Sequence, residues 1–465
     1  MFMRFERVSV ALILALASLT LAASAMGANN PVPLINQPLV PDAVVPGSPA
    51  FTLPVNGTGF VSGSVVNLNG SPRDTTFVSK SQLTAKIKAA DIANAGTASV
   101  TVVNPTPGGG TSNVTFLSIT NSSSSAGFRL GSSPAGGGVA MVVGDFNGDG
   151  KLDLATASFS GNAVAILLGD GAGNFTVGSV FTTGSEPHSL AVGDFNGDGN
   201  LDLAVANSYS RSVSIFLGDG TGNFTPASSP PVGRGPLSIA VGDFNGDGNL
   251  DLAVAVGTDK VEIMLGDGTG NFSRIASPAA GNGPYSIAAG DFNGDGNLDL
   301  AVTDQLSDTV FILLGDGTGH FTHAQTVTVG SEPLSLAVGD FNGDGNLDLA
   351  AASMNDNTVS ILLGDGMGHF TQAASPTTGN YPWPTAVGDF NGDGRPDVAV
   401  ASADGTASIL LQAPGASDFA FGQGHGGEAD SGKPYIPSAT RRHDQRRDEC
   451  DAHERGQHGL YPNQH

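Results

Sequence analysis

An acidic loop that recurs six times constrains this chain more than any other feature. In the second copy it reads GDFNGDGNLDLAV from Gly193, and close copies begin at Gly144, Gly242, Gly290, Gly339 and Gly388. Successive copies lie 48 or 49 residues apart. A fixed period of this size is typical of solenoids and propellers. Each period also holds four short apolar runs separated by glycine turns, which predicts an all-β fold with one four-stranded antiparallel blade per repeat.

The repeats therefore predict a β-propeller over residues 128–412, with six blades as the simplest ring. Residues 126–136 resemble a fourth strand that lacks its own blade, and they could complete the last one. Phe419, however, lies 30 residues after Asp389, so the last blade could own its fourth strand. Seven blades remain the alternative, if the chain hides a degenerate blade.

Within the loop, oxygen-bearing side chains occupy alternate positions. Numbered from the first aspartate, positions 1, 3, 5 and 9 are Asp, Asn, Asp and Asp in all six copies, and position 6 is always glycine. Calcium takes roughly six to eight oxygen ligands, from carboxylates, amides and backbone carbonyls. Carboxylates at odd positions of a tightly curled loop are expected to converge on one ion, joined by the backbone carbonyl of position 7. We therefore predict about six Ca²⁺ sites, one per repeat.

The predicted ligands come from positions 1, 3, 5, 7 and 9 of each loop, with position 7 contributing its backbone carbonyl. In chain order they are Asp145, Asn147, Asp149, Lys151 and Asp153; Asp194, Asn196, Asp198, Asn200 and Asp202; Asp243, Asn245, Asp247, Asn249 and Asp251; Asp291, Asn293, Asp295, Asn297 and Asp299; Asp340, Asn342, Asp344, Asn346 and Asp348; Asp389, Asn391, Asp393, Arg395 and Asp397. An EF-hand would need glutamate at position 12, which here is Thr, Val or Ala. Asp, Asn and Gly also make good hairpin turns without any ion, which is the structural alternative.

The segment DFNGDGNLDLAV, with an apolar strand before it and turns such as ILLGDGTGHF after it, resembles the FG-GAP/VCBS repeat. The resemblance covers most of the chain after residue 128. It implies the calcium-bearing β-propeller found in integrin α-subunits and many secreted bacterial proteins. It also implies that each loop lies between the first two strands of a blade.

Residues 31–120 have no copy elsewhere, and their short β-branched runs separated by turns predict a small β-sandwich. The segments PAFTLPVNGTGFVSGSVVNLNG and GTASVTVVNPTPGGGTSN resemble IPT/TIG domains, which implies an immunoglobulin-like fold. The serine-rich residues 121–127 form the expected linker.

The two ends of the chain differ from the repeats. Residues 1–25 have a basic start, a short apolar run and an Ala-Ser-Ala cleavage pattern, which predicts a secretory signal peptide rather than a membrane anchor. We therefore expect a secreted or cell-surface protein with no transmembrane span in the mature chain. The lone cysteine, Cys450, leaves no disulfide to stabilise it. The His- and Arg-rich segment 413–465 lacks strand periodicity and is interpreted as a disordered tail or the product of a reading-frame slip.

A formal net charge of −24 argues against nucleic acid as a partner. Variable residues follow the proline that opens each repeat, and His188, Tyr285 and Trp383 among them are candidates for binding a ligand near a central channel. Outside the loops no nucleophile–base pair or paired carboxylate stands out, so we predict no catalytic residues. The expected function is non-catalytic binding or adhesion to an extracellular protein or glycan. A polysaccharide lyase or lectin on the same scaffold, or a structural spacer in a surface layer, are the alternatives.

Overall fold

The computed structural model describes residues 29–36, 39, 41, 43–120, 139–391, 393–412 and 419–422. All the regular elements in these ranges are β-strands, and none is a helix that could span a membrane. The predicted signal peptide (1–25) and linker (121–127) lie outside the described residues, as does most of the segment 413–465.

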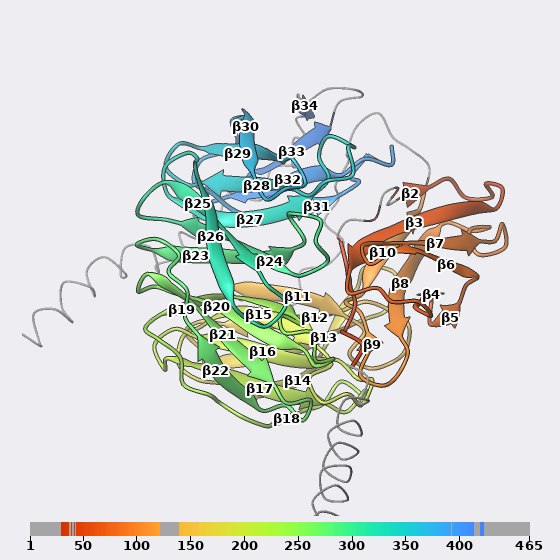
Figure 1. Ribbon diagram of the computed structural model, residues 1–465, viewed down its shortest axis with the longest axis horizontal. Coiled ribbons are helices and arrows are strands. Elements are labelled where there is room, and N and C mark those ends of the chain that lie inside the picture. The colour runs from red at the N-terminus through yellow and green to blue at the C-terminus, as the bar shows by residue number, and fades with distance from the viewer. Residues whose placement is uncertain are drawn as a thin grey trace, which may run out of the picture.

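The N-terminal unit is a sandwich of two sheets (Figure 1). One sheet has the order β1-β3-β7-β6, and the other has the order β2-β10-β8-β4-β5 with β9 paired to β8. Their bounds are β1 Leu34–Ile35, β2 Ala43–Val44, β3 Phe51–Thr58, β4 Val65–Leu68, β5 Ser71–Pro72, β6 Thr75–Ser79, β7 Gln82–Ile87, β8 Gly96–Asn104, β9 Gly110–Thr111 and β10 Thr115–Ile119. Alternate residues such as Leu53 and Val55 of β3 and Val100 and Val102 of β8 fill one shared core. The predicted sandwich is therefore present, while its IPT/TIG identity stays a prediction.

Six four-stranded antiparallel sheets follow, each built from four consecutive strands. The first three are β11 Ala140–Gly144, β12 Asp153–Ser158, β13 Ala163–Gly169, β14 Phe175–Thr182; β15 Pro187–Gly193, β16 Asp202–Asn207, β17 Ser212–Gly218, β18 Phe224–Pro226; and β19 Pro236–Gly242, β20 Asp251–Val256, β21 Lys260–Gly266, β22 Phe272–Ala276. The last three are β23 Pro284–Gly290, β24 Asp299–Asp304, β25 Thr309–Gly315, β26 Phe321–Thr328; β27 Pro333–Gly339, β28 Asp348–Ser353, β29 Thr358–Gly364, β30 Phe370–Ala374; and β31 Pro382–Gly388, β32 Asp397–Ser402, β33 Ala407–Gln412, β34 Phe419–Gly422. One repeat therefore makes one sheet, as the sequence predicts.

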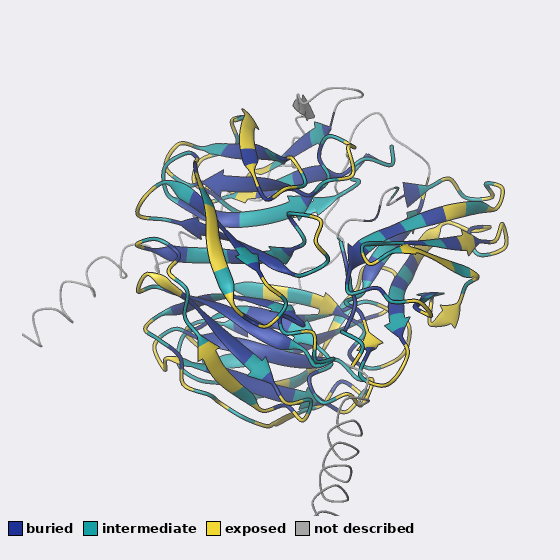
Figure 2. Ribbon diagram, viewed as in Figure 1, coloured by how far each residue is buried: buried dark blue, intermediate teal, exposed yellow. Residues whose placement is uncertain are grey.

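In the first five sheets the middle strands are more buried than the outer fourth strand (Figure 2). The second strands β16, β20, β24 and β28 are buried at every position. Most residues of the fourth strands β14, β18, β22, β26 and β30 are exposed. The second strands are therefore covered on both faces, which explains why they read as continuous apolar runs such as LAVA rather than alternating ones.

Hydrophobic cores join each sheet to the next one along the chain, from the first sheet to the sixth. Within the described residues no such core joins the sixth sheet to the first. Instead Met141 and Val143 of β11 are 60% and 45% exposed, and Pro384 and Ala386 of β31 are exposed as well. The equivalent of Met141 in the second sheet, Leu190, is 6% exposed because it packs against the first sheet.

The sixth sheet takes its fourth strand from its own repeat, since β34 pairs with β33 through Phe419 and Gln412. This is the arrangement in which the last blade owns its strand, and residues 126–136 are not needed to complete that sheet. The exposed flanks of β11 and β31 are where a seventh sheet would insert, so the number of blades in a closed ring stays a prediction.

Candidate functional site

Each acidic loop closes the hairpin between the first and second strands of a sheet. The register places the glycine before the loop opposite the aspartate at position 9, as in the pair Gly193 and Asp202. A side chain at Gly193 would lie 2.7 Å from Leu250 of the next sheet and 2.8 Å from the ring of Phe195, so only glycine fits there. The loop is therefore fixed at both ends by the sheet and by its neighbour.

The first aspartate of the loop is surrounded by backbone N–H groups. In the second loop, Oδ1 of Asp194 accepts the N–H groups of Gly197 and Asp198 at 2.8 and 3.1 Å, and Oδ2 accepts that of Gly199 at 2.9 Å. The amide oxygen of Asn196 in turn accepts the N–H of Asp198 at 2.9 Å. These hydrogen bonds bring positions 1, 3 and 5 together in one tight turn.

The convergence of the loop carboxylates on one ion stays a prediction. In the part of the chain that the structure describes, no three His, Cys, Asp or Glu side chains are grouped closely enough to hold a metal ion. The reason is that N–H groups already satisfy the carboxylates: Asp198 accepts the N–H of Asn200 at 2.8 Å, while Asp202 is turned toward the sheet.

The aspartate at position 9 is a buried link within the hairpin. Oδ2 of Asp202 accepts the N–H of Phe195 and Oδ1 accepts the N–H of Gly218, both at 2.8 Å, and its side chain is fully buried. All six loops repeat this pair of bonds. Burial, with smaller contributions from the position 1 and 5 carboxylates, raises the pKa of Asp202 to about 6 and that of Asp251 to about 8. The position 1 and 5 carboxylates add negative charge around this buried group, which is a setting that suits a cation.

Position 7 divides the loops into two kinds. In the first loop Nζ of Lys151 lies 3.0 Å from Oδ2 of Asp149, and in the sixth loop the Arg395 guanidinium pairs with Asp393. The Lys151 ammonium is the leading cause of a lowered pKa at Asp149. The four middle loops carry Asn200, Asn249, Asn297 and Asn346 at this position and contain no such internal cation. The donor set therefore suits an added cation best in the four middle loops.

A contact that sequence reasoning missed joins each of the first four acidic loops to the next sheet. The phenylalanine at position 2 packs edge-on against the phenylalanine that begins the fourth strand of the following sheet, as in Phe146 and Phe224 with centroids 5.8 Å apart. Its carbonyl oxygen accepts the N–H of the last glycine in the GDGxG turn, here Gly222, at 2.9 Å. The sequence signal for this contact is that both motifs recur at the same spacing.

The three candidate ligand residues meet at the opposite ends of the first strands. His188, Tyr285 and Trp383 come from the second, fourth and sixth sheets, yet their ring centroids lie 5.5 to 6.1 Å apart in all three pairs. Nδ1 of His188 lies 3.0 Å from the carbonyl oxygen of Leu237, and the Tyr285 hydroxyl lies 3.4 Å from Nε2 of His188. Residues from alternate sheets can touch only where the first strands surround a common axis. We call these three residues the aromatic cluster.

The turns around the aromatic cluster have features that the sequence did not single out. Eight non-glycine residues with left-handed backbone lie in the connections and turns at this end: Asn162, Glu186, Arg211, Asp259, Asp308, Glu332, Asn357 and Tyr381. Tyr209, Tyr381 and Leu306 expose 67%, 55% and 53% of their surface there. Glu186, Arg211, Glu332 and Tyr381 adopt a backbone conformation that such residues rarely take, and strain of this kind often occurs at binding sites.

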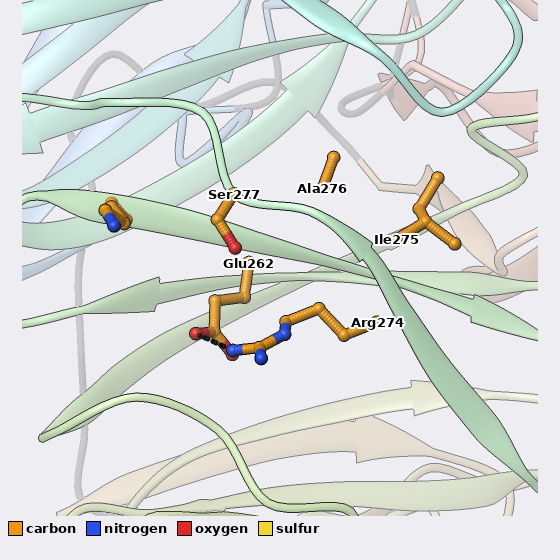
Figure 3. Close-up of a pocket in the computed structure, with 6 residues that line it drawn as sticks. Glu262, Arg274, Ile275, Ala276 and Ser277 are labelled. Carbon is orange, nitrogen blue, oxygen red and sulfur yellow. Dashed lines mark hydrogen bonds and ion pairs between the residues drawn. The ribbon is translucent and has the colours of Figure 1, made fainter.

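An open pocket of 310 Å³ lies on the third sheet, lined by Lys260, Glu262, Arg274, Ile275, Ala276 and Ser277 (Figure 3). Oε1 of Glu262 accepts a hydrogen bond from Arg274 at 2.8 Å, and Oε2 is buried without a described hydrogen-bond partner. Because Oε2 is enclosed, it offers no anchor to a molecule in the pocket. The pocket therefore ranks below the aromatic cluster as a binding site.

Six antiparallel sheets, each with the same acidic loop between its first two strands, define a repeat protein of the propeller type. The FG-GAP-like repeat model matches residues 145–205, 194–254, 245–302, 291–351 and 340–400, and the FG-GAP repeat model matches residues 382–433. These matches cover more than half of the chain, which therefore belongs to the FG-GAP repeat family. No curated protein sequence matches it.

Solved structures of similar fold are distant. A protein from Lactobacillus plantarum has 16% identity and a TM-score of 0.49, covering 70% of this chain and 90% of its own. The periplasmic gluconolactonase of Pseudomonas aeruginosa has 16% identity and a TM-score of 0.46, covering 70% and 91%. A protein of unknown function from Desulfotomaculum acetoxidans has 14% identity and a TM-score of 0.46, covering 57% and 77%. Similarity at this level carries no argument about activity.

Proposed function

We propose that this chain is a secreted, calcium-binding β-propeller protein that recognises an extracellular protein or glycan through the face that carries the aromatic cluster. The observation that supports this most is the meeting of His188, Tyr285 and Trp383, drawn from three different sheets to one point. A strand of seven residues spans about 20 Å, so this face lies well away from the acidic loops at the other strand ends. The acidic loops that stabilise the fold and the aromatic cluster that binds the ligand would then lie at opposite ends of the first strands.

The chemistry of the cluster suits a ligand with apolar faces and hydroxyl groups. Aromatic rings stack on the flat faces of sugars and on apolar side chains, and histidine and tyrosine add hydrogen-bonding atoms. Exposed Tyr209, Tyr381 and Leu306 would extend the contact area beyond the centre. The N-terminal sandwich is proposed to be an IPT/TIG-type immunoglobulin-like domain. Among the described residues, its hydrogen bonds to Asp243 and Asp247 lie at the acidic-loop end of the sheets, away from this face.

Calcium is the second part of the proposal. Positions 1, 3 and 5, with the backbone carbonyl of position 7 and the aspartate of position 9, would supply the oxygen ligands. The ion would supply the positive charge that the four middle loops lack. Bound to the folded state alone, calcium would raise the melting temperature. Addition of EDTA should lower it, and an unchanged melting temperature would remove calcium from the proposal.

Trp383 is the chain's only tryptophan, so its fluorescence reports directly on the aromatic cluster. We expect a ligand found on a glycan or extracellular-protein array to shift Trp383 emission. Trp383→Leu should abolish array binding, while Thr221→Ala, in a turn at the acidic-loop end, should preserve it. Binding that survives Trp383→Leu would contradict this site. Release of unsaturated sugars from a bound polysaccharide would indicate a lyase, and an absence of any ligand would favour a structural spacer.

A further inference from the structure

The third acidic loop differs from the other five because the N-terminal sandwich lies on it. Asp243 is the only first aspartate of a loop that is buried, at 9% exposure, among the six that the structure describes. The backbone N–H of Val32 donates to Oδ2 of Asp243 at 2.9 Å, and Nδ2 of Asn29 donates to the carbonyl oxygen of Asp247 at 3.0 Å. A segment more than two hundred positions away along the chain thus reaches into the centre of a predicted calcium loop.

The contact belongs to the sandwich as a whole. Nδ2 of Asn104 donates to the carbonyl oxygen of Pro31 at 2.8 Å, and Nδ2 of Asn30 donates to that of Pro105 at 2.7 Å, so the segment at the loop is fastened to the turn after β8. Leu34 of β1 packs against the core between the third and fourth sheets. A side chain at Gly248 would meet Asn30 at 2.8 Å, which shows how closely the two backbones approach.

Equivalent positions in the other loops show that this contact is specific. A side chain at Gly150, Gly199 or Gly345 would meet nothing within 4 Å. The fourth and sixth loops touch the sandwich only lightly, with Lys80 and Pro41 at 3.5 Å from such a side chain. Among the described loops, the sandwich therefore makes its closest contact with the third.

The hydrogen bonds at Asp243 use all the acceptor sites of its carboxylate. An ionised carboxylate has about four lone-pair sites. Oδ1 of Asp243 accepts the N–H groups of Gly246 and Asp247 at 2.7 and 3.2 Å, and Oδ2 accepts those of Gly248 and Val32 at 3.0 and 2.9 Å. Asp194, in contrast, accepts three N–H groups from its own loop, so one lone-pair site on its Oδ2 is left for another donor or a cation.

We propose that the third acidic loop is the anchor of the N-terminal sandwich, and that the Val32 N–H and a divalent cation compete for the same site on Oδ2 of Asp243. While the sandwich is bound to Asp243, the third loop holds no cation, so the chain binds one cation fewer than it would with this loop open. Binding of a cation to the third loop would in turn weaken the attachment of the sandwich. The anchor itself needs no metal, whereas the competition rests on the calcium binding proposed above.

The anchor is tested by amide hydrogen exchange of the full chain in EDTA, in peptides that contain Val32. Asp243→Asn replaces the accepting oxygen with an amide group and should speed this exchange roughly ten- to hundredfold, because a hydrogen bond to a charged acceptor is lost. Asp194→Asn makes the same change in a loop that the sandwich does not touch, and should leave it unchanged. An unchanged rate in Asp243→Asn, or an equal rise in both variants, would overturn the anchor.

The competition is tested by calcium titration calorimetry with Val32→Pro, which removes the N–H, and Val32→Ala, which keeps it. Val32 lies between Pro31 and Pro33, so its backbone is already restricted to extended conformations that proline tolerates. We expect Val32→Pro to bind one ion more than the wild type and Val32→Ala to match the wild type. Equal stoichiometry in all three would refute the competition. If no variant bound calcium, the calcium proposal would fall with the competition, while the exchange result for the anchor would stand.

Discussion

The ring of Phe195 meets the ring of Phe272 edge-on, with centroids 5.5 Å apart and an angle of 82° between the planes. Phe195 belongs to the acidic loop of the second sheet, and Phe272 begins the fourth strand of the third sheet. The carbonyl oxygen of Phe195 also accepts the N–H of Gly270 at 3.1 Å. The acidic loop is therefore part of the interface between sheets, so order in the loop and contact between neighbouring sheets depend on each other.

Loss of this aromatic pair should weaken the contact between sheets. Phe272→Ala should lower the free energy of unfolding by about 0.5–1.5 kcal/mol more than Phe175→Ala. The reason is that Phe272 packs against the loop phenylalanine of the preceding sheet, whereas Phe175 begins the fourth strand of the first described sheet. Urea denaturation of both variants measures the difference. Equal losses would mean that the pair contributes only through the area it buries.

The aspartate at position 9 should matter for stability whether or not a metal is bound. Asp202→Ala leaves the buried N–H groups of Phe195 and Gly218 without an acceptor, which should cost about 2–6 kcal/mol for the two groups together. Asp219→Ala, at an exposed turn, is the control and should cost far less. Chemical denaturation in EDTA separates this structural role from metal binding, and a loss seen only with calcium present would contradict it.

Position 7 should set the calcium affinity of individual loops. Lys151→Asn removes the internal cation from the first loop and should create a tighter site there, because one positive charge no longer occupies Asp149. Asn200→Lys makes the reverse change in the second loop and should remove a site. Calorimetric titration of both variants compares the number and affinity of the sites. Unchanged isotherms for both would show that position 7 does not influence the ion.

The exposed flank of the first sheet gives a direct test of ring closure. Met141→Asn should change the free energy of unfolding by about 0.5 kcal/mol or less, as at other exposed sites. Leu190→Asn, at the equivalent buried position of the second sheet, should cost several times more, because a polar group enters the core between sheets. A large cost for Met141→Asn would mean that a further part of the chain or another copy covers this flank.

Repetition made much of the fold predictable. A glycine, a run of alternating Asp and Asn, and a buried apolar strand recur at one spacing, and these local signals decide where each hairpin turns and which strands are covered on both faces. The four-stranded sheets and the N-terminal sandwich could therefore be predicted from the sequence. The candidate positions His188, Tyr285 and Trp383 could be predicted too, because they vary at an otherwise constant place. Their contact with one another could not.

The sequence by itself determined what each repeat becomes, since hydrogen bonding and burial within one sheet depend on residues close together along the chain. Only the tertiary structure decided how the repeats differ in their surroundings. The first sheet exposes Met141 where the second buries Leu190, and the third loop alone gives its last acceptor site to Val32. The physical reason is that identical loops receive different neighbours once the chain folds back on itself, and a carboxylate responds to the nearest N–H group wherever that group lies in the sequence.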